Sequence, residues 1–190
     1  MRIIAGRFRN QRLDAPPGRE TRPTAERARE ALFNRLEHGP YRDLLRDGLF
    51  TDLFAGTGAV GLEALSRGAA GALFVEQDRA AIRALEGNLR RLGADAEGRA
   101  ISADATRLPA APAAADILFL DPPYGGGMAA PALASAKAMG WLKPDALVVV
   151  QQHPKEPFAA PAGFHLVDDR RYGANHLYFL ERGEGGGGNG

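Results

Sequence analysis

TDLFAGTGAVG, residues 51–61, joins a short apolar run to a glycine-rich turn and then to a helix-like pattern. This order predicts a strand, a tight loop and a helix. Gly56, Gly58 and Gly61 have the G-x-G-x-x-G spacing, which lets a backbone turn sharply, approach a ligand closely and pack a helix against a strand. The spacing favours a nucleotide-like ligand, although three glycines can also mark an ordinary strand-to-helix turn.

A second apolar run, residues 72–76, ends in Glu76, twenty residues after Gly56. An acidic side chain there can accept hydrogen bonds from both hydroxyls of a ribose, which NAD and S-adenosylmethionine both carry. Asp52 helps to choose between them, because a carboxylate ahead of the glycines suits a cationic amino group better than a pyrophosphate. These residues favour S-adenosylmethionine, and a purely structural Asp52 bonded to loop amides remains the alternative.

The apolar run 117–120 ends at Asp121-Pro122-Pro123-Tyr124. Two consecutive prolines cannot continue a central strand, so the chain should leave the sheet in the crevice at the carboxyl ends of the strands, where such folds bind ligands. Asp121 and the carbonyl of Pro122 can accept hydrogen bonds from an exocyclic amine of a nucleobase and so localise its lone pair on nitrogen. Tyr124 can stack on the base. The alternative is a strand-ending turn with a core tyrosine.

Strand-like and helix-like segments alternate from residue 49 onward, which predicts an α/β fold with a parallel sheet covered by helices on both faces. The strand-like runs are 49–53, 72–76, 99–102, 116–120 and 146–150. Residues 164–167 and 177–180 are expected to form an antiparallel pair. We expect a basic hairpin arm over 1–20, one catalytic domain over 21–182 and a disordered tail over 183–190.

The charge of the chain is segregated. The 190 residues carry a formal net charge of only +1, yet residues 1–35 hold nine arginines against four acidic residues. A basic arm on a nearly neutral body suggests a polyanionic partner, although it can also be a solvated face. Cysteine is absent, which excludes disulfides and thiolate catalysis, and the four histidines lack metal-ligand spacing. No long apolar or signal-like segment occurs, so we expect a soluble, cytoplasmic protein. We also expect a monomer.

Several blocks resemble a known family. DPPY at 121–124 is similar to the catalytic signature of methyltransferases that act on exocyclic amino groups of nucleobases, and DLFAGTGAVGLEALSRGA at 52–69 resembles their cofactor loop. RIIAGRFRNQRL at 2–13 and RPTAERAREALFNRL at 22–36 resemble the opening of the bacterial small-subunit ribosomal RNA guanine-N2 methyltransferases, the type that modifies guanine 966 of 16S rRNA. The resemblance covers most of residues 2–180.

This resemblance implies a Rossmann-like class I methyltransferase with a seven-stranded, mostly parallel sheet whose last strand is antiparallel. It implies S-adenosylmethionine as cofactor and 16S rRNA or the small ribosomal subunit as partner. Together with the motifs, it gives as candidates for cofactor binding Thr24, Asp52, Gly56, Thr57, Gly58, Glu76, Asp104 and Ala105. The candidates for catalysis are Asp121, Pro122 and Tyr124, and those for RNA binding are Arg7, Arg9 and Arg22.

Three alternatives stay open. An NAD-dependent oxidoreductase would use the same glycine loop but leaves DPPY unexplained, and an RNA-binding module could keep the fold without the reaction. Within methyltransferases, adenine N6 would be served equally well by DPPY. Asp104 can instead cap a short helix. The chain also departs from the family where Gln151 and Gln152 follow the fifth strand, because an acidic residue is expected there.

Overall fold

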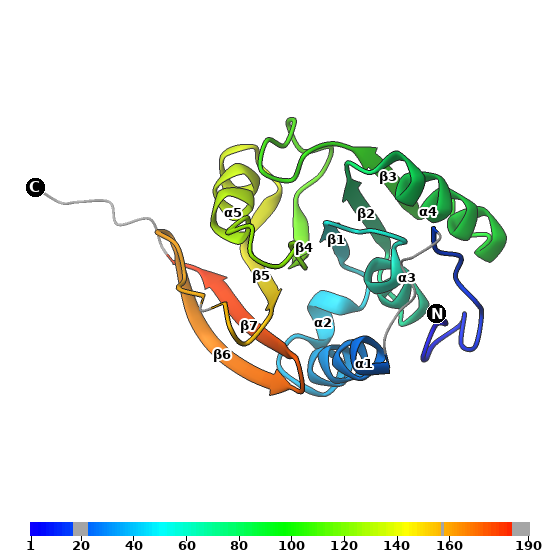
Figure 1. The fold of residues 1–190 in the computed structure, drawn as a ribbon, viewed down its shortest axis with the longest axis horizontal. Helices are drawn as coiled ribbons and strands as arrows, with labels where there is room; N and C mark the ends of the chain where they lie inside the picture. Colours follow the sequence, from blue (N-terminus) through cyan, green and yellow to red (C-terminus); the bar gives the residue numbers. More distant parts are fainter. Residues whose placement is uncertain (17–22, 157, 184–190) are drawn as a thin grey trace, which may run out of the picture.

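The computed structural model describes residues 1–16, 23–156 and 158–183, and in these ranges a seven-stranded sheet forms the centre of the molecule (Figure 1). The strand order is β3-β2-β1-β4-β5-β7-β6. The strands are β1 Leu49–Leu53, β2 Gly71–Glu76, β3 Gly98–Ser102, β4 Ala115–Leu120, β5 Leu142–Gln152, β6 Phe164–Tyr172 and β7 Asn175–Arg182. The pairs among β1 to β5 are parallel, and β7 runs antiparallel to both of its neighbours, β5 and β6. The fold predicted from the sequence is confirmed.

Helices cover both faces of this sheet unequally. The helices of the described ranges are α1 Pro23–His38, α2 Arg42–Leu45, α3 Ala59–Ser66, α4 Arg79–Leu92 and α5 Ala129–Ala138. Side chains alternate between the faces of a strand, so Ile117 and Phe119 of β4 pack with α1 to α4, whereas Leu118 and Leu120 pack with α5. None of these helices has the length and apolar character needed to cross a bilayer.

The elements nearest the site begin and end for local reasons. Helix α4 has Asp78 as its N-cap, whose side chain accepts a hydrogen bond from the Ala81 N–H at 2.8 Å, and it stops at Gly93, which has φ of 64°. Helix α3 starts directly after Gly58, which has φ of 82°. Strand β1 lies between β2 and β4, with Leu53 beside Leu120. The glycine loop and the DPPY loop therefore leave the sheet side by side.

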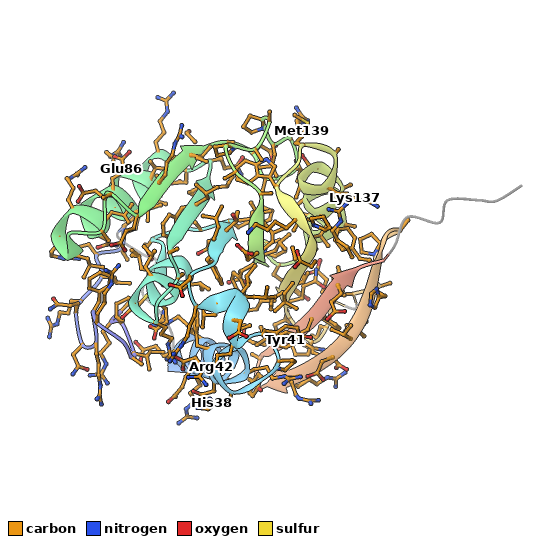
Figure 2. All side chains as sticks on the ribbon, turned by 180° about the vertical axis from the view of Figure 1, so that it is seen from behind. His38, Tyr41, Arg42, Glu86, Lys137 and Met139 are labelled. Carbon is orange, nitrogen blue, oxygen red and sulfur yellow. The ribbon has the colours of Figure 1, made fainter. Side chains whose placement is uncertain are left out.

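The far edge of the sheet is longer than the sequence pattern indicated. Strands β6 and β7 extend to a turn at Gly173, which has φ of 60°, and curve away from the rest of the sheet in Figure 1. Strand β6 is hydrogen-bonded to a neighbour on one side only. Because many of its residues are polar, its full length does not show as an apolar run in the sequence. Tyr41, labelled in Figure 2, lies just before α2 and stacks on Phe179 of β7, with ring centroids 6.5 Å apart. This contact joins the α1–α2 connection to the edge of the sheet.

The expected N-terminal β-hairpin is reduced to a loop with one antiparallel bridge, between Arg2 and Arg12. Some of its backbone N–H groups bond across the loop, as those of Ile3 and Leu13 do to the carbonyls of Gln11 and Met1 at 3.0 and 2.9 Å, and others bond to α3. Those of Ile4 and Ala5 donate to the carboxylate of Glu63 at 2.8 and 3.0 Å. Those of residues 7 and 8 donate to the carbonyl and the hydroxyl of residue 66, each at 2.9 Å. Residues 1–13, called the N-terminal loop below, are thereby docked on the helix that follows the glycine loop.

Candidate active site

A cavity of about 290 Å³ lies where β1 and β4 end. It is lined by Met1, Arg29, Asp52, Phe54, Ala55, Gly56, Thr57, Ala59, Val60, Phe119, Asp121 and Gln151. A larger hollow of about 820 Å³ lies between the N-terminal loop and α1, but none of the predicted cofactor or catalytic residues lines it. The smaller cavity brings together four of those residues, from β1 and from the loops that follow β1 and β4, and is the candidate active site.

The glycine loop keeps its shape through tight packing as well as through its backbone angles. Gly58 has φ of 82°, and a Cβ built there would lie 2.3 Å from Leu85 Cδ1 of α4. At Gly61 a Cβ would lie 2.3 Å from Phe74 Cε1 of β2. Both positions therefore exclude side chains because of the fold itself. Gly58 is not among the residues that line the cavity.

Asp52 is buried in β1, only 2% exposed, and lines the cavity. Its carboxylate accepts a hydrogen bond from the Gly61 N–H at 3.1 Å, so the structural alternative raised by the sequence holds in part. Burial raises the pKa of Asp52 to about 8, and the negative charges of Asp121 and Glu76 add to that shift while the Gly61 N–H opposes it. One hydrogen bond leaves this carboxyl group poorly compensated, and a cation in the cavity would favour its ionised form.

Glu76 and Asp104 lie at the ends of β2 and β3, further along the same sheet edge and outside the cavity lining. The carboxylate of Glu76 accepts hydrogen bonds from the Gly56 N–H and from the N–H groups of residues 77 and 78, each at 2.8 Å. Asp104 accepts from the N–H and hydroxyl of Thr106, and these bonds lower its pKa. Asp104 therefore forms a side-chain-closed turn instead of a helix cap, and Ala105 beside it is buried.

Asp121 lines the cavity and is exposed there, although protein atoms crowd around its carboxyl group. This crowding raises the pKa of Asp121 to about 6, and a hydrogen bond from the side chain of Gln151 counteracts part of the shift. Gln151 lines the same cavity. The position where the family is expected to carry an acidic residue is thus held by a neutral amide that donates to Asp121.

Pro122 and Tyr124 lie outside the cavity lining, on the loop that continues from Asp121. Tyr124 is 66% exposed, and its ring meets that of His153 edge to face, with centroids 4.9 Å apart. The next part of the loop is held by Glu156, whose carboxylate accepts hydrogen bonds from Gly125 N–H at 3.2 Å and from Gly127 N–H at 3.3 Å. The segment after β5 therefore contacts the DPPY loop twice, through His153 at the tyrosine and through Glu156 at the glycines.

The predicted RNA-binding arginines are not equivalent. Arg7 forms an ion pair with Glu97 at the surface, whereas Arg9 is exposed and its side chain has no hydrogen bond or ion pair within the described residues. Arg22 lies outside the described residues. The side chain of Thr24 does too, although its backbone belongs to the first turn of α1.

Sequence reasoning missed Met1, Arg29, Phe119 and Gln151 as cavity residues. Arg29 is only 5% exposed, and its guanidinium donates to the Arg2 carbonyl at 2.7 Å. Its position was readable, because Arg29, Phe33 and Leu36 have the i, i+4, i+7 spacing of one helix face, and the last two are fully buried. Gln151 is the next-to-last residue of β5, at the same sheet edge as Asp121, and this position is the signal that could have found it.

Comparisons of the sequence show its relatives. The family model described as "Conserved hypothetical protein 95" matches residues 1–181. Ribosomal RNA small subunit methyltransferase D of Escherichia coli strain K12 is 39% identical over 185 residues, which are 95% of this chain and 90% of that relative. Both matches run from the N-terminal loop to the last strands.

Comparisons of the fold agree. The structure described as putative methyltransferase yhhF from Escherichia coli superposes with a TM-score of 0.81 at 33% identity, covering 96% of this chain and 97% of that one. The Thermus thermophilus 16S rRNA N2 G1207 methyltransferase RsmC, solved with AdoMet and guanosine, gives 0.63 at 25% identity over 88% of this chain and 45% of that one. The chain thus belongs to the family described as conserved hypothetical protein 95 and is a relative of the ribosomal RNA small subunit methyltransferase D proteins.

Proposed function

We propose that this chain uses S-adenosylmethionine to methylate the exocyclic N2 of a guanine in small-subunit 16S rRNA, of the position-966 type. One observation carries the proposal: Asp52 and Asp121, from neighbouring strands, line a single cavity beside Gly56 and Thr57. The two carboxyl groups suit a cationic cofactor and a nucleobase amine. The printed description of the Thermus RsmC structure, with AdoMet and guanosine, supports the same pair of ligands.

The residues present fit the cofactor. S-adenosylmethionine supplies an electrophilic methyl group on a sulfonium centre. Asp52, whose pKa is raised to about 8 by burial, would regain its ionised form beside the ammonium group. Glu76, at the end of β2, would bind the ribose while keeping the glycine loop in place through the Gly56 N–H. We assign the adenine to Asp104 and Ala105 after β3, and Thr24 to the cover of the cofactor.

Asp121 is the residue that we assign to the target amine. Its pKa of about 6 leaves it ionised at neutral pH, able to accept a hydrogen bond from the guanine N2. The carbonyl of Pro122 would be the second acceptor, so that the nitrogen lone pair points toward the methyl group. Tyr124 is free on one side for a base to stack against, which contributes roughly 1 to 3 kcal/mol. A guanine N2 is shielded in a paired helix, so the target should be an exposed loop nucleotide.

The N-terminal loop is the part of the chain that we assign to RNA. The side chains of Arg2, Arg9 and Arg12 are exposed and have no hydrogen bond or ion pair within the described residues. Such arginines are suited to phosphate contacts, which fix the register of a nucleic acid on a protein. Arg22 remains part of this proposal, while Arg7 is better explained as an anchor of the loop on Glu97. The proposal includes a monomeric enzyme in the cytoplasm.

The test supplies unmodified small subunits, naked 16S rRNA and DNA in separate reactions with labelled S-adenosylmethionine, and identifies the methylated nucleoside by mass spectrometry. We expect N2-methylguanosine in the ribosomal RNA alone. N6-methyladenosine as the only product would overturn the choice of guanine and keep the role of Asp121, because an adenine amine needs the same acceptors. Label in DNA with none in RNA would overturn the assignment of the N-terminal loop.

A further inference from the structure

Arg29 is a buried cation whose charge is incompletely compensated. Its side chain is 4% exposed and lines the candidate active site. One guanidinium nitrogen donates to the Arg2 carbonyl at 2.7 Å, but Nε has no hydrogen-bond partner within the described residues. Burial lowers the pKa of Arg29, against the opposing influence of the nearest carboxylate, Glu63. A guanidinium in such surroundings is costly unless an anion meets it.

Glu63 compensates Arg29 only in part, because its carboxylate is hydrogen-bonded to other groups. Its oxygens accept hydrogen bonds from the Ile4 N–H at 2.8 Å, the Ala5 N–H at 3.0 Å and Arg67 Nε at 2.8 Å. The distance from Arg29 Nε to the nearer Glu63 oxygen is 3.7 Å, an ion pair without a hydrogen bond. Arg29 therefore keeps unused donor capacity, and it lines the cavity.

The same cavity holds the opposite case, the poorly compensated carboxyl group of Asp52. Within the described residues, Arg29 and Asp52 form no hydrogen bond or ion pair with each other. The cavity thus offers one site for a cation and a separate site for an anion. A free α-amino acid group is a zwitterion that carries both, and the cofactor proposed above ends in one.

We propose that Arg29 binds the carboxylate at the amino-acid end of the cofactor, while Asp52 binds its ammonium group. The inference rests on the proposed function, because it takes S-adenosylmethionine as the ligand. It adds a discrimination that the glycine loop and Glu76 do not provide, since those residues contact parts that every adenosyl compound shares. Arg29 would make the protein select a ligand with an intact carboxylate.

The experiment compares three ligands by calorimetry: S-adenosylmethionine, its decarboxylated form and 5′-methylthioadenosine. Decarboxylation removes the carboxylate alone and keeps the ammonium, the sulfonium and the adenosine. We expect the wild-type protein to bind S-adenosylmethionine about 10- to 100-fold more tightly than the decarboxylated form, the range for one charged hydrogen-bonded contact. Arg29→Met should abolish this preference and leave the affinity for the decarboxylated form within about twofold. Arg27→Met, an exposed position on the same helix, should change neither affinity.

The outcomes separate the inference from the function beneath it. An equal loss of affinity for all three ligands in Arg29→Met would mean that Arg29 only supports the fold, and would overturn the inference while methyl transfer stands. A wild-type protein without preference for the carboxylate would overturn it without any variant, which covers the case in which Arg29→Met does not fold. A wild-type protein that binds none of the three ligands would overturn the proposed function itself.

Discussion

Without ligand, the Asp52→Asn variant is expected to be more stable than the wild type, and this difference in the free energy of unfolding should grow as the pH rises. Burial raises the pKa of Asp52 to about 8 from its ordinary value of 3.8, so the folded protein holds a proton that the unfolded chain has released. An acid with a raised folded-state pKa contributes stability that is lost as pH rises between the two values and stays level above the higher one. Asparagine does not titrate, and its side-chain oxygen can still accept from the Gly61 N–H.

The magnitude follows from the linkage between protons and folding. Each pH unit in this window changes the free energy of unfolding by about 1.4 kcal/mol at most. Between pH 5 and 8, the advantage of Asp52→Asn over the wild type should therefore grow by up to roughly 4 kcal/mol. The same variant should bind S-adenosylmethionine more weakly, because it cannot place a negative charge beside the ammonium group. A gain in stability with a loss of binding is the usual mark of a residue kept for function.

Urea denaturation of both proteins at pH 5, 6, 7 and 8, without ligand, measures this difference directly. Asp145→Asn is the matched control, since Asp145 is exposed and this variant should follow the wild type at every pH. A constant difference between wild type and Asp52→Asn across the four pH values would refute the reasoning, because it would mean that Asp52 is ionised in the folded protein throughout.

Three further predictions concern the reaction and the RNA. The methylation rate should fall as the pH drops through about 6, where Asp121 becomes protonated. Asp121→Ala should lose most of kcat while S-adenosylmethionine binds as before, and an equal loss of rate and binding would mean that Asp121 belongs to the cofactor site. Glu156→Ala should lower kcat about tenfold by freeing the DPPY loop, and Glu156→Gln should retain part of the rate, with cofactor affinity unchanged in both. Identical rates for the wild type and the two variants would exclude this positioning role. Replacing Arg9 and Arg12 by alanine should reduce the slope of log RNA affinity against log salt by roughly 1.4 to 1.8, whereas Arg7→Ala should leave the slope nearly unchanged. Equal slopes in the wild type and all variants would mean that the N-terminal loop does not contact RNA.

The sequence predicted those features whose signals are local. Helix α4, Arg79–Leu92, has both of its ends encoded beside it, by the Asp78 cap and the terminal Gly93. The proximity of Asp52 and Asp121 was also predictable, since the glycines and the paired prolines each mark a strand end and parallel strands end at one edge of a sheet. Strand β6 was read too short, because a solvated edge strand does not need an apolar face.

Features that depend on distant residues were not predictable. Glu97, which pairs with Arg7, lies 90 positions away in the chain. No residue close to Arg7 in the sequence therefore indicates that its charge is already paired. His153 lies beyond the next strand and helix from Tyr124, and no pattern links the two rings. The N-terminal loop is held by hydrogen bonds to Glu63, which is fully buried. Glu63 is the one charged residue of α3, and such a residue is ordinarily expected to face solvent.

The position of Met1 has a practical consequence for how the protein should be produced. Met1 lines the candidate active site, its carbonyl accepts from the Leu13 N–H at 2.9 Å, and Ile3 is fully buried. A purification tag fused ahead of Met1 would emerge beside the cavity, where it would compete with RNA and disturb the docking of the loop. Strand β7, which ends at Arg182, lies on the other side of the molecule from the N-terminus (Figure 1). Affinity handles, fluorophores and surface-immobilisation linkers therefore belong at the C-terminal end.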